Sequence, residues 1–206
     1  MDPAVLLYFI PTFFFVSATP GMCMTLALTL GMTIGVKRTL PMMVGELLGV
    51  ATVAISALIG VAALLLQYPH LFTGLKAIGA AYLFYLGIQM WRAKGKLAIP
   101  SGLSEQKETS FWGLANQGYV TAIANPKGWA FLVALLPPFI DATKSLAPQA
   151  SVLISIILVF EFICMMLYAT GGQTLRRALL NKGNVVLMNR VSGTLMMGVG
   201  IWLAIG

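Results

Sequence analysis

The sequence predicts an all-α integral membrane protein with six transmembrane helices, and two observations support that prediction. Of its 206 residues, 59% are hydrophobic and only 9% are charged, and the mean hydropathy is +0.90. Such a composition lies far outside the range of soluble domains. The apolar residues also form runs long enough to cross a bilayer, which takes roughly 20 residues at about 1.5 Å per residue.

Six such runs follow one another with little sequence between them. They are expected to cover residues 4–31, 39–66, 71–91, 111–136, 150–170 and 185–206. The longest polar stretch, residues 92–110, has room only for a short loop, so we expect a single transmembrane domain over residues 1–206. The start, Met1-Asp2-Pro3, lacks the positive flank of a secretory signal, so the first segment is expected to be retained.

The basic residues predict the orientation in the membrane. Because basic residues are retained on the cytoplasmic side, the first, third and fifth loops are predicted to be cytoplasmic and both termini periplasmic. Among the residues outside the apolar segments, only Lys144 departs from this pattern. The net charge of +7 is therefore explained by topology and by membrane lipid, with no nucleic-acid partner. The loop residues are Lys37, Arg38, Arg92, Lys94, Lys96, Lys107, Arg176, Arg177, Lys182 and Arg190, and residues 174–190 are expected to form a basic helix at the inner surface.

Two of the six segments contain a helix breaker in the middle of the apolar run. These are Thr19-Pro20-Gly21 in the first segment and Asn125-Pro126-Lys127 in the fourth. Proline removes a backbone donor and crowds the preceding turn, so helices 1 and 4 are predicted to be broken near the midplane. The breaks lie half a chain apart, and three segments per half is an odd number. We therefore expect a 3+3 inverted-topology repeat with halves of about 1–95 and 108–206.

The two breaks together predict a binding site for a small zwitterion. A broken helix exposes amides at the start of one half-helix and carbonyls at the end of the other, and these ends carry opposite partial charges. An amino acid offers the complementary carboxylate and ammonium. Alternatively, the prolines only kink packed helices. The candidate substrate-binding residues are Thr19, Pro20, Gly21, Met22, Asn125, Pro126 and Lys127.

Three ionisable residues within apolar segments are candidates for coupling. Lys127 either binds substrate or alternates between substrate and a carboxylate of the protein; the alternative is a structural ion pair with Glu46 or Glu161. Glu46 and Glu161 are candidates for proton coupling, because a carboxyl group in a poorly solvated cavity can bind and release a proton as its exposure changes. Alternatively, Glu46 only hydrogen-bonds a neighbouring helix, since Gly45 and Gly49 form a close-packing face around it.

The remaining inventory argues against an enzyme. Cys23 and Cys164 lie in apolar segments without CxxC or metal-ligand spacing. The chain has a single histidine, His70, so we expect neither a zinc cluster nor a nucleophilic triad. We expect no metal and no cofactor.

Several local patterns are shared with a known family. They are Pro20-Gly21 in the first segment, Asn125-Pro126-Lys127 followed by Leu136-Pro137 in the fourth, and the third-segment run from Leu75 to Ile88. Through these motifs the chain resembles the LysE/RhtB family of amino-acid exporters along nearly its whole length. The resemblance implies export of amino acids or related metabolites across the bacterial inner membrane, driven by the proton gradient.

The sequence leaves several alternatives open. A membrane thiol-disulfide electron carrier also uses prolines in its first and fourth segments, and a passive small-solute channel needs no coupling residues. An acidic residue in the path favours a cationic substrate such as lysine, whereas neutral amino acids such as threonine or homoserine fit equally well if that residue carries only the proton. Small transporters of this size often pair, so a homodimer is a further possibility.

Overall fold

The structure is a computed structural model that describes residues 3–67, 69–93, 110–141, 143–174 and 182–205. The all-α prediction is confirmed for these residues. The predicted basic loop residues Lys94, Lys96, Lys107, Arg176 and Arg177 lie outside them. The α-helices are α1 (Pro3–Ala18), α2 (Met22–Ile34), α3 (Val36–Gln67), α4 (Pro69–Arg92), α5 (Phe111–Ile123), α6 (Pro126–Leu135), α7 (Leu146–Thr174) and α9 (Lys182–Ile205), with a 3₁₀ turn, η2 (Pro137–Phe139), after α6.

Up to five candidate membrane spans occur among the described residues. Helices α3, α7 and α9 are long and apolar enough to cross a bilayer alone. The pairs α1–α2 and α5–α6 qualify together, bent by 54° and 53° at their breaks. The predicted interruptions of the first and fourth segments are therefore confirmed. Helix α4, with 24 residues, is outside this count, so the sixth crossing stays a prediction.

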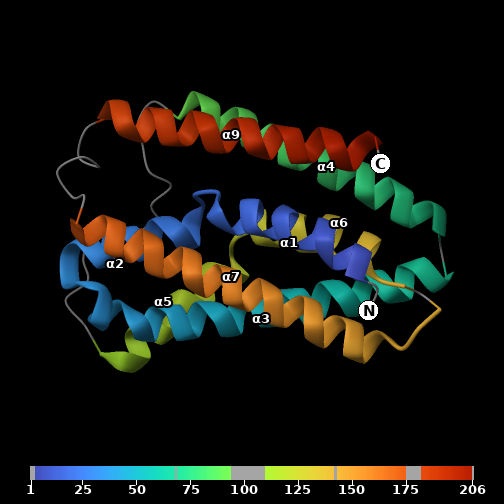
Figure 1. Cartoon of the computed structure of the whole chain (residues 1–206), viewed down its shortest axis with the longest axis horizontal. Helices are drawn as coiled ribbons and strands as arrows, with labels where there is room; N and C mark the ends of the chain where they lie inside the picture. Colours follow the sequence, from blue (N-terminus) through green and yellow to red (C-terminus); the bar gives the residue numbers. More distant parts are fainter. Residues whose placement is uncertain (1–2, 68, 94–109, 142, 175–181, 206) are drawn as a thin grey trace.

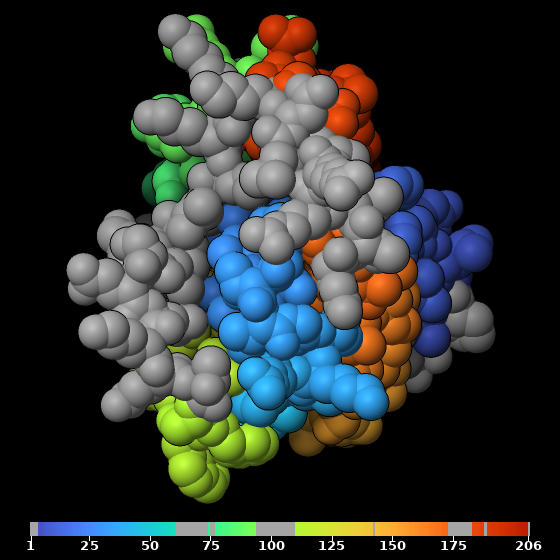
Figure 2. Space-filling model, turned by 90° about the vertical axis from the view of Figure 1, so that its left-hand side faces the viewer, coloured from blue at the N-terminus to red at the C-terminus, as the bar shows by residue number. Residues whose placement is uncertain are grey.

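The segments run along the long axis of the molecule, and each reverses the direction of the one before it (Figure 1). The beginning of α1 and the end of α9 consequently lie at the same end. Helices α4 and α9 form a pair on one side, α3, α5 and α7 lie on the other, and α1 and α6 lie between them. At the opposite end from the termini, the passage from α2 into α3 lies between α5 and α7 (Figure 2).

Small residues allow the helix pairs to approach closely. On the α3–α5 contact, a Cβ atom added to Gly45 would overlap the carbonyl group of Ala115, and one added to Gly118 would overlap that of Met42. This confirms the close-packing face predicted around Glu46. Close approach of small residues is how membrane helices gain van der Waals contact without a hydrophobic driving force.

Helices α4 and α9 also approach each other closely at small residues. A Cβ atom added to Gly87 would lie 2.7 Å from the carbonyl oxygen of Gly193, which is too close for any real contact. Helix α9 has its main contacts among the described elements with α4. The two helices thus form a unit that lies beside the rest of the bundle.

An aromatic cluster fills the space between α1 and the turn after α6. The ring centroids of Phe9 and Phe13 are 4.3 Å apart, and that of Phe139 is 5.1 Å from Phe9. All three side chains are buried. Phe9 and Phe13 precede the first break and Phe139 follows α6, so the cluster lies on the side of the breaks where the chain begins.

Candidate functional site

The first break lies between α1 and α2, where Pro20 cannot donate a backbone hydrogen bond. Gly21 is the N-cap of α2, in an extended conformation (φ −143°, ψ −167°), and no side chain caps the first turn. The backbone amide of Thr25 makes the first helical bond, to the carbonyl of Gly21. The amides of the preceding turn are therefore left without an intrahelical acceptor, and they carry the positive end of the helix dipole.

The carbonyl end of α1 is completed by side chains that are distant in sequence. The ammonium nitrogen of Lys127 donates to the carbonyl oxygens of Val16, at 3.0 Å, and Thr19, at 2.6 Å. The hydroxyl of Tyr168 donates to the carbonyl of Ala18 at 2.9 Å. Helices α6 and α7 therefore supply the hydrogen bonds that the first break needs.

The second break, between α5 and α6, is satisfied by its own residues. The Asn125 side chain accepts from the backbone amide of Lys127 at 3.1 Å, and Pro126 occupies the first helical position, where a missing amide costs nothing. The indole nitrogen of Trp129 donates to the carbonyl of Ile123 at 2.8 Å. The Asn125 amide group also reaches the sulfur of Cys23, at 3.5 Å, and so links the two breaks.

Two cavities meet at these breaks, and both are lined by Gly21, Asn125 and Lys127. The first, which we call the inner chamber, has a volume of about 50 Å³ and includes Ser17, Cys23, Glu46, Phe131 and Glu161 in its lining. The second, which we call the vestibule, has a volume of about 240 Å³. Its remaining lining residues are Pro20, Met22, Thr25, Leu86, Gln89, Met90, Ala93, Pro126, Asn189 and Met196.

The two carboxylates of the inner chamber have different surroundings. Glu161 accepts a hydrogen bond from the hydroxyl of Ser17 at 2.8 Å. Glu46 is fully buried, no described N–H or O–H group donates to either of its oxygens, and the Cys23 thiol of α2 interacts with it. Its ionisable neighbours are Glu161, Lys127 and the Cys23 thiol. The alternative in which Glu46 serves only to hydrogen-bond a neighbouring helix stays a prediction.

The structural ion pair of Lys127 with Glu46 or Glu161 does not form in this structure. Among the described residues, the one ion pair within 4.0 Å joins Lys144 to Asp141, in the exposed turn before α7. Lys127 binds backbone carbonyls in place of a carboxylate, because its side chain extends from α6 toward the open end of α1.

The structure brings most of the predicted site residues together. Pro20, Met22 and Pro126 line the vestibule, and Glu46 and Glu161 line the inner chamber. Thr19 is the exception. Its hydroxyl bonds back to the carbonyl of Phe15, and only its own carbonyl takes part, as an acceptor for Lys127.

Sequence reasoning missed Tyr168 and the apolar residues of the vestibule wall formed by α4 and α9, namely Leu86, Met90 and Met196. Tyr168 stands seven residues after Glu161, which places both on one face of α7, and that spacing was an available signal. Leu86, Met90 and Met196 are apolar residues in apolar segments, so nothing in their pattern distinguishes a cavity wall from lipid contact.

Several helices are apolar enough to cross a bilayer, and the two bent pairs meet at buried charged groups. These features are typical of a membrane transport protein. The chain belongs to the LysE type translocator family, whose pattern matches residues 14–206. The predicted family resemblance is confirmed, and the family is one of transporters, not enzymes. It favours transport over the thiol-disulfide carrier, and both cysteines are free and buried.

Relatives in several bacteria match along most of the chain. A protein of Vibrio cholerae named "Uncharacterized membrane protein" is 33% identical, with 99% of this chain and 98% of the relative covered. A homoserine/homoserine lactone efflux protein of Salmonella typhimurium is 28% identical over 91% of this chain and 90% of the relative. A leucine efflux protein of an Enterobacter species is 29% identical over 93% and 90%. No solved structure matches significantly.

Proposed function

We propose that the protein exports neutral amino acids, or closely related small metabolites, from the cytoplasm across the bacterial inner membrane in exchange for protons. The observation that carries the proposal is the convergence of both helix breaks, one lysine and two buried carboxyl groups on a pair of joined cavities. The efflux activities that name its relatives, for leucine and for homoserine and its lactone, support the substrate class.

Six crossings in a 3+3 inverted repeat are the architecture that we propose for this transport. If the halves, about 1–95 and 108–206, are exchanged, α1, α2, α3 and α4 correspond to α5, α6, α7 and α9. The α2–α7 contact then corresponds to α6–α3, the α1–α7 contact to α5–α3, and the α4–α9 contact to itself. All of these contacts occur, and the two bends differ by only a degree. The plan is typical of secondary transporters, whose substrate sites lie at the repeat interface.

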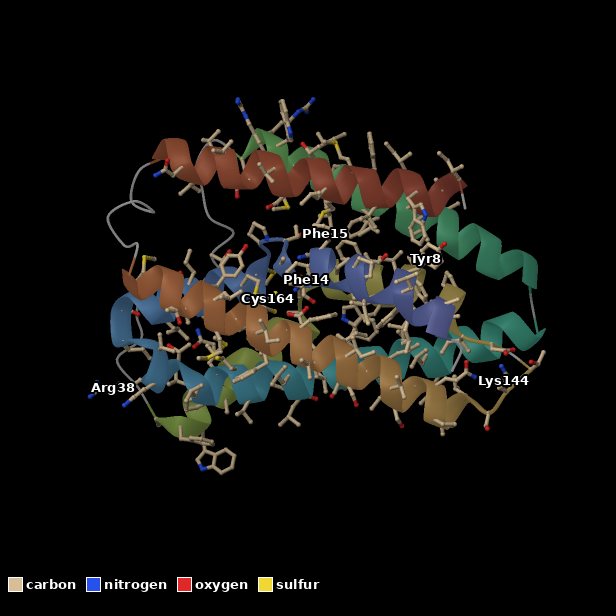
Figure 3. All side chains as sticks on the ribbon, in the orientation of Figure 1. Tyr8, Phe14, Phe15, Arg38, Lys144 and Cys164 are labelled. Carbon is tan, nitrogen blue, oxygen red and sulfur yellow. The ribbon has the colours of Figure 1, made fainter. Side chains whose placement is uncertain are left out.

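We infer the orientation in the membrane from the basic loop residues, of which Lys144 is the exception to the predicted pattern. Arg38 lies at one end and Lys144 at the other (Figure 3). We place the Arg38 end in the cytoplasm and both termini in the periplasm. The vestibule extends toward the Arg38 end, since Ala93 follows α4 and Asn189 lies in the first part of α9. The buried cluster of Phe9, Phe13 and Phe139 lies on the other side, which supports a state open to the cytoplasm.

A neutral zwitterion fits the vestibule better than a cationic amino acid does. Lys127 is the only charged side chain among the described lining residues, and no carboxylate is present to balance a second cation. The open amides at the start of α2 suit a carboxylate. Leu86, Met90 and Met196 offer apolar contacts to an uncharged side chain.

Glu46 and Glu161 are the proposed proton carriers. A buried carboxylate that accepts no N–H or O–H hydrogen bond is costly, so Glu46 gains most from taking up a proton or a cation. The inner chamber, at about 50 Å³, has room for a few water molecules between the two carboxyl groups. Lys127 and Cys23 are the other ionisable groups that face this space.

Counterflow in proteoliposomes tests the proposal. Labelled leucine, homoserine and lysine are offered with and without an imposed pH gradient to the wild type, to Glu46→Gln and Glu161→Gln, and to the surface control Lys144→Met. We expect selective uptake of the neutral amino acids, driven by the pH gradient and no longer driven by it in the two glutamine variants. Flux that ignores the gradient would keep the transporter but remove proton coupling by Glu46 and Glu161, and absence of flux in folded protein would overturn the function.

A further inference from the structure

The ammonium group of Lys127 occupies a site that suits any primary ammonium. It bonds to the carbonyls of Val16 and Thr19, at the negative end of the α1 dipole. The ring of Phe131 lies 5.7 Å from the nitrogen, within range of a cation–π contact. The α-ammonium of an amino acid presents the same donors on a similar carbon. The pocket that sequence reasoning assigned to substrate is therefore filled by a residue of the protein.

The stem of Lys127 crosses the junction of the two cavities. The side chain lines both the inner chamber and the vestibule. A Cβ atom added to Gly21 would lie 3.1 Å from Cδ of Lys127, so the stem lies directly against the backbone of the first break. Val16 lines only the inner chamber, whereas Lys127 lines both cavities, so a molecule entering from the vestibule would meet Lys127 before the carbonyl of Val16.

We propose that Lys127 is an internal stand-in for the substrate's ammonium, bound to the α1 carbonyls when the site is empty and displaced from them when an amino acid enters. This inference rests on the proposed function. The exchange replaces one ammonium by another, so the number of hydrogen bonds at the carbonyls is kept and the swap costs little. The displaced lysine moves toward the inner chamber, where Glu46 accepts no hydrogen bond from a described N–H or O–H group and Glu161 bonds only Ser17 among the described residues.

The stand-in matters most for the empty transporter. A carrier that has released its substrate must reorient without it, and two bare buried carbonyls beside two carboxyl groups would oppose that step. Lys127 fills the site during the return. During exchange, by contrast, substrate occupies the site in both directions and the lysine is dispensable. Removing the lysine should thus separate net efflux from exchange.

The experiment compares two modes of efflux from proteoliposomes loaded with a labelled amino acid, the fastest of leucine, homoserine and threonine. Net efflux is measured into substrate-free buffer, and exchange into buffer that contains the same unlabelled amino acid. We expect Lys127→Met to lose roughly tenfold or more in net efflux while exchange falls by about twofold or less, because only the empty return needs the lysine. Lys127→Arg should recover part of the net efflux, and Lys144→Met should behave as wild type.

Equal loss of both modes in folded Lys127→Met would show that the lysine holds the substrate directly, and it would overturn the stand-in. Equal retention of both modes would overturn it as well. If Lys127→Met does not fold, Gly21→Ala serves instead, since its methyl group displaces the lysine stem and should lower the ratio of net efflux to exchange. A wild type that moves no amino acid in either mode would instead overturn the proposed function itself.

Discussion

The two helix breaks have nearly the same bend, 54° and 53°, yet they are held in opposite ways. The break at Asn125-Pro126 is satisfied by neighbours in sequence, namely the Asn125 cap and the Trp129 indole. The break at Pro20 depends on Lys127 and Tyr168, from the other half of the chain, and leaves the first amides of α2 uncapped. The first break therefore retains groups for a ligand, while the second is a rigid support that presents the lysine.

Among the variants that test this difference between the breaks, Tyr168→Phe is expected to lower the stability most. The change leaves the partly buried carbonyl of Ala18 without its donor, which costs about 1–3 kcal/mol. Thermal unfolding in detergent should show the loss, with Tyr119→Phe, on the exposed face of α5, as the matched control. Equal stability of the two variants would mean that the first break does not rely on α7.

A somewhat smaller effect is expected from Asn125→Ala. The variant loses the cap of α6, worth about 1 kcal/mol, and the contact with Cys23. Ser110→Ala removes the comparable cap of α5, at an exposed helix start, and should cost a similar amount of stability without changing transport. Asn125→Asp keeps the cap acceptor and should recover stability. If it also recovers full transport, the amide contact with Cys23 has no role.

Trp129→Phe should lower the stability by a still smaller amount. The indole bond to Ile123 is lost, but the side chain is 36% exposed, so we expect a destabilisation of about 0.5–1 kcal/mol, within the range of one hydrogen bond. Unfolding in detergent measures it beside Tyr168→Phe. A larger cost for Trp129→Phe than for Tyr168→Phe would reverse the comparison between the two breaks.

The smallest effect is expected from Thr143→Ala, in the turn before α7. The hydroxyl and amide of Thr143 and the ammonium of Lys144 lower the pKa of Asp141 from 3.8 to about 2. Since the folded-state pKa is depressed, the associated stability is complete above about pH 4 and is lost as the pH falls toward 2. The variant should raise the pKa of Asp141 toward its ordinary value, as NMR titration would show, and leave transport near neutral pH unchanged. A changed transport rate would connect this turn to the site.

Much of the fold could be predicted because its signals act within one or two helical turns. Apolar runs of sufficient length predicted the helices, and Pro20 and Pro126 predicted both breaks, since a missing donor and a fixed φ act on the adjacent turn. The Gly45–Gly49 spacing predicted a close-packed face on α3, which the contact with α5 confirms.

The site was predictable in its members but not in their partners. Lys127, Glu46 and Glu161 were recognisable because charge in an apolar segment is costly, and each was assigned to a carboxylate, a substrate or a neighbouring helix. The structure instead places Lys127 on the carbonyls of α1 and leaves Glu46 without an N–H or O–H donor among the described residues. Such pairings join residues roughly half a chain apart, and no local periodicity encodes them.

The sequence by itself determined that this chain lies in a membrane and that its first and fourth segments break. Each of these depends on the burial of apolar side chains or on hydrogen bonds within a turn. Only the tertiary structure decided that Lys127 and Tyr168 complete α1 and that α4 and α9 wall the vestibule. Those outcomes depend on how whole helices pack, because an open carbonyl accepts from whichever donor the packing brings within reach.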